Sequence, residues 1–449
     1  MIRELMSGIL FLISLMLLAT LSARKVAGKR HGFRVGTIIS LAGVTFLLAL
    51  LLINDAFPFT DGGDDLDYFY ASSQSFSSLG DWFDTARYAS SHEQAGYPLL
   101  LAWVDHFSGD SLYYRKALNV FFMLEIVVVW FSIGNAVGGS RLAFIYAWGM
   151  IFATPLWFYW FFLLKDLAIV LLQSIFVLGL IRFISSERGF RGYGLIALST
   201  IAVIPFRSML AVLNILLFIA CMFVRRRSVT SSASFAARLV VAASLVLGLW
   251  AFVSQPGAMG TLGVTGGDRA LSMEGILAQL ERAERDRQSF GYNPLLFPVL
   301  YLVGETNALN PNNWAWVEAE QLRPLSMVPW ILAGLPFFLA GAGMMLRRTR
   351  AWQRFASLVR HHGRHANSEN FTARQTDSLL VLLAFILAYA VLGWLNGTTV
   401  RWTLPAIPAM ISIAGFAWAN MSKRMRIRLL TSFDLSFLTL AVGYYLVLK

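Results

Sequence analysis

The feature of this sequence that most constrains its fold is a series of long apolar runs separated by short polar segments. A helix needs roughly 20 mostly apolar residues to cross the hydrocarbon core of a bilayer. On that template we predict an all-α polytopic membrane protein with about twelve transmembrane helices. The predicted spans are 5–23, 35–54, 117–137, 142–162, 166–183, 193–206, 208–224, 237–253, 326–346, 377–395, 403–420 and 429–447.

The composition excludes a set of water-soluble domains. Hydrophobic residues make up 57% of the chain and charged residues 14%, whereas about 25% of an average globular protein is charged. The net charge of +12 comes from basic residues dispersed between the apolar runs, which is typical of membrane topology and not of a nucleic-acid partner. Cys221 is the one cysteine, so the chain forms no internal disulfide.

Charge is unevenly distributed among the segments that connect the apolar runs. Lysine and arginine gather in the segments 24–34, 134–141, 182–191, 225–238, 347–374 and 423–428. The positive-inside rule places these segments in the cytoplasm. The two long loops, 55–116 and 254–325, then lie outside, and the first of them holds ten acidic and three basic residues.

The same rule decides how residues 193–224 fold. One continuous helix there would move the basic segment 347–374 to the outside, so we predict a hairpin that turns at Pro205–Arg207. In the first outer loop, the apolar stretch Tyr97–Val104 is too short to span a bilayer. We predict that it forms an amphipathic helix lying in the membrane interface.

The densest acidic cluster lies directly outside the second predicted span, where four aspartates fall within residues 61–67. Asp64 and Asp65 follow two glycines, and two adjacent carboxylates can act as a general base, bind a divalent metal such as magnesium or manganese, or do both. A loop that is acidic only because it lies on the outer face would have its carboxylates distributed along its whole length. We therefore predict Asp64 and Asp65 as catalytic residues.

A second group consists of basic residues on the predicted outer face, where the positive-inside rule does not expect them. Lys165, Arg207 and Arg401 each lie at a predicted turn between two apolar runs. Each alone could simply extend its charge to lipid headgroups, but as a set beside an acidic loop they suit a phosphate or pyrophosphate. Glu125 lies inside the third span, where we favour a structural partnership with a neighbouring helix over a proton or ion path.

Four stretches of the chain resemble the GT-C superfamily of membrane glycosyltransferases, which take sugars from polyprenyl-phosphate carriers. They are Gly63–Ala71, with an Asp followed four residues later by Tyr, Gly96–Ala102, Leu164–Asp166, and Arg401–Pro408, which reads Arg-x-x-x-Pro-x-x-Pro. The likeness is to the mannosyl- and aminoarabinose-transferase type. Many relatives have Asp-Glu where this chain has Asp64-Asp65, which leaves open which of the two is the base.

The resemblance implies roles for individual residues. Asp64 would be the catalytic base, Asp65 would share that role or hold a metal, and the cations Lys165, Arg207 and Arg401 would bind the donor phosphate. Because aromatic rings stack on sugar faces, the second outer loop is a candidate platform for the acceptor. The predicted substrate contacts are Tyr68, His92, Tyr97, Trp314 and Trp316.

Together with the hydropathy pattern, the resemblance implies an integral-membrane glycosyltransferase with a GT-C-like fold and two long periplasmic loops carrying short interfacial helices. It would move a sugar from a polyprenyl-phosphate carrier to a lipid or glycan hydroxyl, with inversion, at the periplasmic face of a bacterial inner membrane. Residues 1–420 would form the catalytic domain, and 421–449 a basic loop and a last helix.

Two other functions stay open at this point. A polysaccharide polymerase or ligase would use a glycan linked to a lipid pyrophosphate, and Arg207, Arg269 and Arg323 would suit such a substrate. A lipid or glycan transporter would place Glu125 and Arg207 in a translocation path. Transporters often show two matching halves, and the absence of such a repeat disfavours the transporter.

Overall fold

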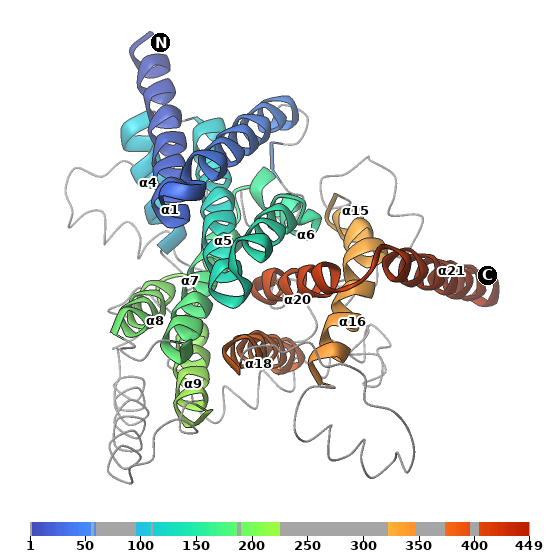
Figure 1. Ribbon diagram of the computed structural model, residues 1–449. Helices are drawn as coiled ribbons and strands as arrows, with labels where there is room; N and C mark the ends of the chain where they lie inside the picture. The colour runs from blue at the N-terminus through green and yellow to red at the C-terminus, as the bar shows by residue number, and fades with distance from the viewer. Residues whose placement is uncertain are drawn as a thin grey trace, which may run out of the picture.

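The structure is a computed structural model that describes residues 2–54, 58–59, 96–108, 111–185, 190–224, 322–346, 373–395 and 404–448. Within these ranges every regular element is a helix (Figure 1), which confirms the all-α class there. The helices are α1 (Ile2–Asn54), α4 (Gly96–Ser108), α5 (Leu112–Ile151), α6 (Thr154–Phe161), α7 (Asp166–Ser185), α8 (Phe190–Val203), α9 (Ser208–Val224), α15 (Leu322–Pro329), α16 (Leu335–Leu346), α18 (Ala373–Leu395), α20 (Ile407–Asn420) and α21 (Lys423–Leu448). A π-helical turn, Trp330–Gly334, joins α15 to α16, and a 3-10 turn, Leu404–Ala406, precedes α20.

α1 is a helical hairpin whose two arms meet at a kink. Gly28, at the kink, has a φ of 69°, a conformation that glycine adopts without steric penalty. The hydroxyls of Thr20 and Ser40 lie 2.9 Å apart, although twenty residues of straight helix would separate them by about 30 Å. The two arms therefore run antiparallel, and they correspond to the predicted spans 5–23 and 35–54.

α5 folds back in the same way at Gly138 and Gly139, where Gly139 has a φ of 78°. On either side of this kink the two arms touch backbone to backbone. A Cβ atom on Gly134 would lie 2.6 Å from the Cα of Ala143. The first arm matches the predicted span 117–137, and the second arm begins the span 142–162.

Substitution of Gly134 by alanine is expected to destabilise the protein by about 3 kcal/mol, because the new methyl group would force two backbones apart. Gly194 is the matched control, since a Cβ there meets nothing within 4 Å and alanine favours helix over glycine. Thermal unfolding of the purified protein in detergent measures both. Equal melting temperatures for Gly134→Ala and Gly194→Ala would contradict the close approach of the two arms.

α7 lies at the centre of the bundle, in contact with α5, α8, α9 and α18. α8 returns antiparallel to it, since a Cβ on Gly192 would lie 2.7 Å from the backbone nitrogen of Phe183. The chain then turns at residues 204–207, where the Arg207 amide donates to the carbonyl oxygen of Val203 at 2.8 Å. This turn confirms the predicted hairpin, and it makes α7 and α9 run in the same direction.

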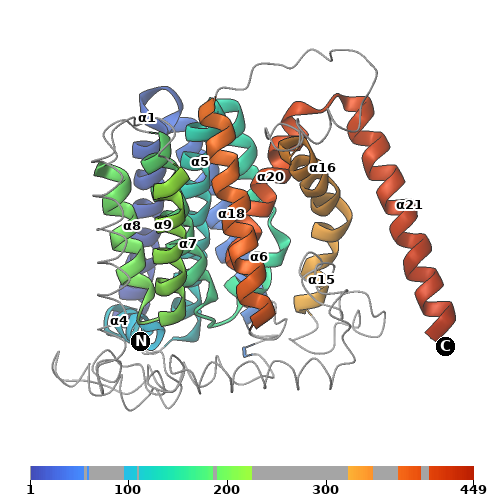
Figure 2. The ribbon, with the colours of Figure 1, turned by 90° about the horizontal axis from the view of Figure 1, so that it is seen from below.

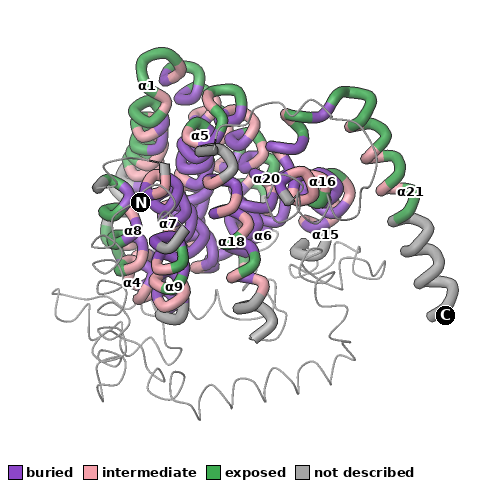
Figure 3. Tube along the Cα trace, turned by 60° about the horizontal axis from the view of Figure 1, so that its bottom comes forward, coloured by how far each residue is buried: buried purple, intermediate pink, exposed green. Residues whose placement is uncertain are grey.

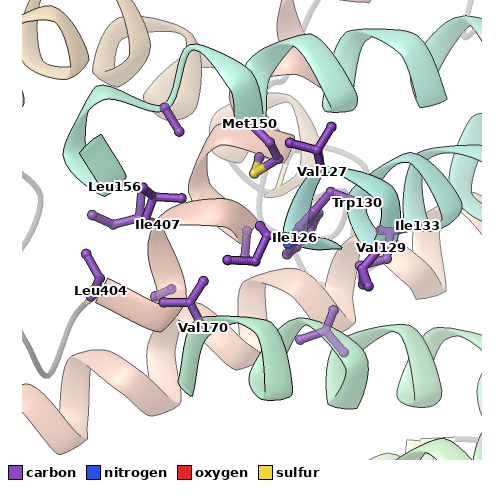
Figure 4. Close-up of a cluster of buried hydrophobic side chains, with 14 of the residues drawn as sticks. Ile126, Val127, Val129, Trp130, Ile133, Met150, Leu156, Val170, Leu404 and Ile407 are labelled. Atoms are coloured by element: carbon purple, nitrogen blue, oxygen red, sulfur yellow. The ribbon is translucent and has the colours of Figure 1, made fainter. Parts of the chain in front are cut away.

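An apolar core joins α5, α6, α7 and the start of α20 (Figure 4). In it, Ile126 of α5 lies between Trp130 on one side and Val170 of α7 on the other, and Leu404 lies beyond Val170. The indole nitrogen of Trp130 donates to the Ser174 hydroxyl at 2.9 Å. This contact keeps the buried polar edge of the tryptophan satisfied and fixes α7 against α5.

In the part of the chain that the structure describes, four helical stretches are long and apolar enough to cross a membrane: Gly8–Leu52, Leu112–Ile151, Asp166–Ile184 and Ser326–Met345. Leucines cover the outward surface of α1, among them Leu10, Leu18, Leu48 and Leu52, whereas α5, α7 and α20 are largely buried (Figure 3). An apolar exterior around a buried bundle is typical of a protein surrounded by lipid. These helices indicate a membrane protein. The predicted span 237–253 lies outside the described residues.

The bundle has two distinct ends (Figure 2). The end that we call the α4 end holds α4, the beginning of α5, the turn at 162–165 and the turn at 204–207. The kinks of α1 and α5 lie at the opposite end (Figure 2), together with the basic residues Arg24, Lys25, Lys29 and Arg30 beside Gly28. α1 contacts α4.

Candidate functional site

α4 is fixed to the bundle by its first two residues. The Gly96 amide donates to the carbonyl oxygen of Pro205 at 3.0 Å, and a Cβ on Gly96 would lie 2.9 Å from that oxygen, so only glycine fits. Tyr97, Leu101 and Val104 are buried, while Trp103 is 52% exposed. The stretch predicted as an amphipathic helix is therefore helical, with an apolar side against the bundle.

Asn119, on the second turn of α5, joins α4 to the segment between α6 and α7. Its side-chain oxygen accepts a hydrogen bond from the buried hydroxyl of Tyr97 at 2.9 Å. Its side-chain nitrogen donates to the carbonyl oxygens of Tyr159 at 3.2 Å, Phe162 at 2.6 Å and Leu164 at 3.2 Å. Carbonyls at the end of a helix need partners from outside the helix, and Asn119 supplies one. Its amide thereby fixes the backbone just before Lys165.

Two further cations, Arg115 and Lys116, lie at the beginning of α5 and are completely buried. The Arg115 guanidinium donates to the carboxylate of Asp105 on α4. The Lys116 ammonium lies 5.5 Å from the centre of the Phe162 ring, within the range of a cation–π interaction. Arg115 is therefore held by α4, and Lys116 lies beside the 162–165 turn.

The fourth cation of this end is Arg207, whose guanidinium lies 3.8 Å from the Asp166 carboxylate. Both residues are buried. Asp166 is the first residue of α7, where the helix dipole favours a negative charge. Lys165, next to it in the chain, is half-buried. We call Arg115, Lys116, Lys165 and Arg207, with their carboxylates Asp105 and Asp166, the basic cluster.

The structure brings three of the sequence-predicted site residues to one place. Lys165 and Arg207 belong to the basic cluster, and Tyr97 is linked through the Asn119 side chain to the turn that carries Lys165. Tyr97 is fully buried, and its contact with substrate stays a prediction. The remaining predicted residues lie outside the described part of the chain: Asp64, Asp65, Tyr68, His92, Trp314, Trp316 and Arg401.

Leu404, three residues after Arg401 in the chain, is fully buried beside α7. Figure 4 shows it near Val170, one turn beyond Asp166. The chain therefore enters the bundle close to the ion pair shortly after Arg401. In the described ranges no group of histidine, cysteine, aspartate and glutamate side chains could hold a metal ion, and the predicted metal ligand Asp65 falls outside those ranges.

Glu125 accepts a hydrogen bond from the Ser22 hydroxyl at 3.1 Å. This contact links α5 to the first arm of α1, which agrees with the structural interpretation of Glu125. Arg182 donates similarly to Ser132 at 3.1 Å, linking α7 to α5. Polar contacts between helices are the expected way to accommodate such groups inside an apolar bundle.

Sequence reasoning missed Arg115, Lys116 and Asn119. Arg115 and Lys116 stand directly before the predicted span 117–137, so the argument that singled out Lys165 also applies to them. Asn119 is a polar residue inside an apolar run, which signals a buried hydrogen-bonding role. No family model, no curated protein and no solved structure matches this chain.

Proposed function

We propose that this chain is an integral-membrane glycosyltransferase with about twelve transmembrane helices in a GT-C-like arrangement. It transfers a sugar from a polyprenyl-phosphate carrier to a lipid or glycan hydroxyl at its α4 end, which faces the periplasm of a bacterial inner membrane. The observation that supports this proposal is the basic cluster, in which four cations from three parts of the sequence lie at the same end of an apolar bundle, two of them paired with carboxylates.

The basic cluster has the chemistry that a carrier-phosphate leaving group needs. As the bond to the sugar breaks, negative charge grows on the phosphate, and fixed cations in a poorly hydrated setting lower the energy of that state. Arg207 offers a planar pair of donors, and Lys165 offers a point charge. Because the backbone before Lys165 is fixed by Asn119, these charges need little rearrangement during the reaction.

The proposed general base comes from the first outer loop. Asp64 and Asp65 lie between Asn54, the last residue of α1, and Gly96, the first of α4. A carboxylate there would take the proton from the acceptor hydroxyl as the hydroxyl attacks the anomeric carbon. Direct displacement by one base, without a covalent intermediate, inverts the anomeric centre.

The proposal is tested by release of carrier phosphate from purified protein in nanodiscs, using a panel of polyprenyl-phosphate sugars with membrane acceptor lipids. We expect release by the wild type, with a decrease of at least about 100-fold in Asp64→Asn or Asp65→Asn, since loss of a general base typically lowers the rate 10²–10⁴-fold. Asp377→Asn, at the start of α18, is the control for loss of a carboxylate elsewhere.

The same assay separates the competing functions. Release from lipid-pyrophosphate oligosaccharides alone would favour the polymerase or ligase, and no release with any donor would count against both enzymes. Nuclear magnetic resonance of the product determines the anomeric configuration, and retention would contradict a single-displacement mechanism.

A further inference from the structure

Two buried amide side chains lie deeper in the bundle than the basic cluster. Gln173 of α7 and Asn214 of α9 are both completely buried. Among the described residues, neither the oxygen nor the nitrogen of either amide has a hydrogen-bond partner. A buried polar atom without a partner costs about 1–3 kcal/mol, so native proteins keep such atoms for a reason.

The register of the two helices relates these amides to the ion pair. Gln173 follows Asp166 by seven residues, and Asn214 follows Arg207 by seven residues. Residues seven apart share a helix face, and seven residues of helix span about 10 Å. Gln173 thus shares the Asp166 face of α7, whereas Arg207 directly precedes α9. Since α7 and α9 run in the same direction and contact each other, Gln173 and Asn214 lie at a similar depth, about 10 Å below the Asp166–Arg207 pair, and we call the two residues the amide layer.

The chemistry of this layer differs from that of the basic cluster. A primary amide offers donors and an acceptor but no charge, so it matches hydroxyl groups and does not match a phosphate or a metal ion. A ligand that fits both layers has an anionic part for Arg207 and a neutral, hydroxyl-bearing part for the amides. A sugar joined to a phosphate has both parts.

We propose that Gln173 and Asn214 are specificity-determining residues that bind hydroxyl groups of the donor sugar when its phosphate lies at Arg207. This inference rests on the proposed function. In the structure both amides are packed without a partner, so the contact between α7 and α9 opens to admit the sugar. Binding of the sugar then supplies the missing hydrogen bonds. Without ligand, the protein is less stable than it would be with apolar side chains at these two positions.

Leucine at these positions separates a ligand-binding role from a structural one. Replacing an unpartnered buried polar group by an apolar group of similar size is neutral or stabilising. We therefore expect Gln173→Leu, Asn214→Leu and the double variant to melt, without ligand, at the wild-type temperature or above it. Ser199→Ala removes a buried hydroxyl that bonds to the Leu195 carbonyl of its own helix and is the control.

The experiment titrates the melting temperature with two ligands, polyprenyl phosphate and a panel of polyprenyl-phosphate sugars. The wild type is expected to bind one glycosylated carrier more tightly than the bare carrier. In each leucine variant, the ratio of the affinity for the glycosylated carrier to that for the bare carrier should fall about tenfold. The affinity for the bare carrier should stay unchanged, and Ser199→Ala should behave like the wild type.

Three results would overturn the inference. Lower melting temperatures for the leucine variants without ligand would show that the amides bond across the helix interface. Wild-type selectivity retained in the double variant would show that the sugar binds elsewhere, and the proposed function would survive. No stabilisation of the wild type by either ligand would overturn both the inference and the proposed function.

Discussion

Replacement of Asn119 by leucine is expected to lower the free energy of unfolding by about 3 kcal/mol and, in the proposed enzyme, the turnover per folded molecule about 100-fold. The stability loss follows because the Tyr159 and Leu164 carbonyls and the Tyr97 hydroxyl each lose their hydrogen bond with Asn119, at about 1 kcal/mol for each bond. The Phe162 carbonyl loses Asn119 as well but keeps the Leu164 amide as a donor at 2.9 Å. The turnover loss follows because the backbone before Lys165 is released, and small misplacements of a charged group cost about 10²-fold.

Tyr97→Phe is the matched control for Asn119→Leu, because it removes a single bond of the same network and is expected to cost about 1 kcal/mol. Chemical denaturation measures the stability of both variants, and carrier-phosphate release per folded molecule measures turnover. If Asn119→Leu lowered only the folded fraction and left kcat per folded molecule intact, Asn119 would be a structural residue and not a positioning residue. A decrease of kcat larger than the change in KM supports positioning.

Hydropathy predicted much of the helical framework, for a physical reason. An apolar run of spanning length has to be a helix in lipid, because no water is present to satisfy its backbone groups. Every predicted span except 237–253 overlaps a helix of the structure. The chain reverses at Gly28 and at Gly138–Gly139, and both places fall between predicted spans. The short segments that interrupt the apolar runs contain these glycines, which allow the chain to turn.

The interior of the candidate site was less predictable, because it depends on contacts between distant segments. Asn119 lies forty residues before Tyr159 and more than twenty after Tyr97, and nothing in its local sequence specifies those partners. Lys116 likewise lies 5.5 Å from the ring of Phe162, a residue distant in the sequence. The sequence pattern predicts that cations lie at the ends of spans. Which of these cations lie at the same end of the bundle follows only from the packing of the helices.

Arg207→Met is expected to reduce both stability and activity, because Arg207 has two tasks in the proposed enzyme. It balances the buried Asp166 carboxylate at 3.8 Å, and loss of one partner of a buried ion pair costs about 3–5 kcal/mol. It also faces the donor phosphate, where loss of one stabilising group typically costs 10²–10³ in kcat. Denaturation and carrier-phosphate release measure the two effects separately.

The double variant Asp166→Arg, Arg207→Asp separates these tasks. Exchanging the two charges keeps an ion pair and should return part of the stability lost in Arg207→Met, although an arginine at the first residue of α7 opposes the helix dipole. It would place a carboxylate where the phosphate needs a cation, so turnover should stay low. Arg207→Lys keeps the charge but loses the planar donor pair, and we expect intermediate turnover. If the exchange restored turnover together with stability, Arg207 would serve only the ion pair, and phosphate binding would have to rest on Lys165 and the cations at the beginning of α5.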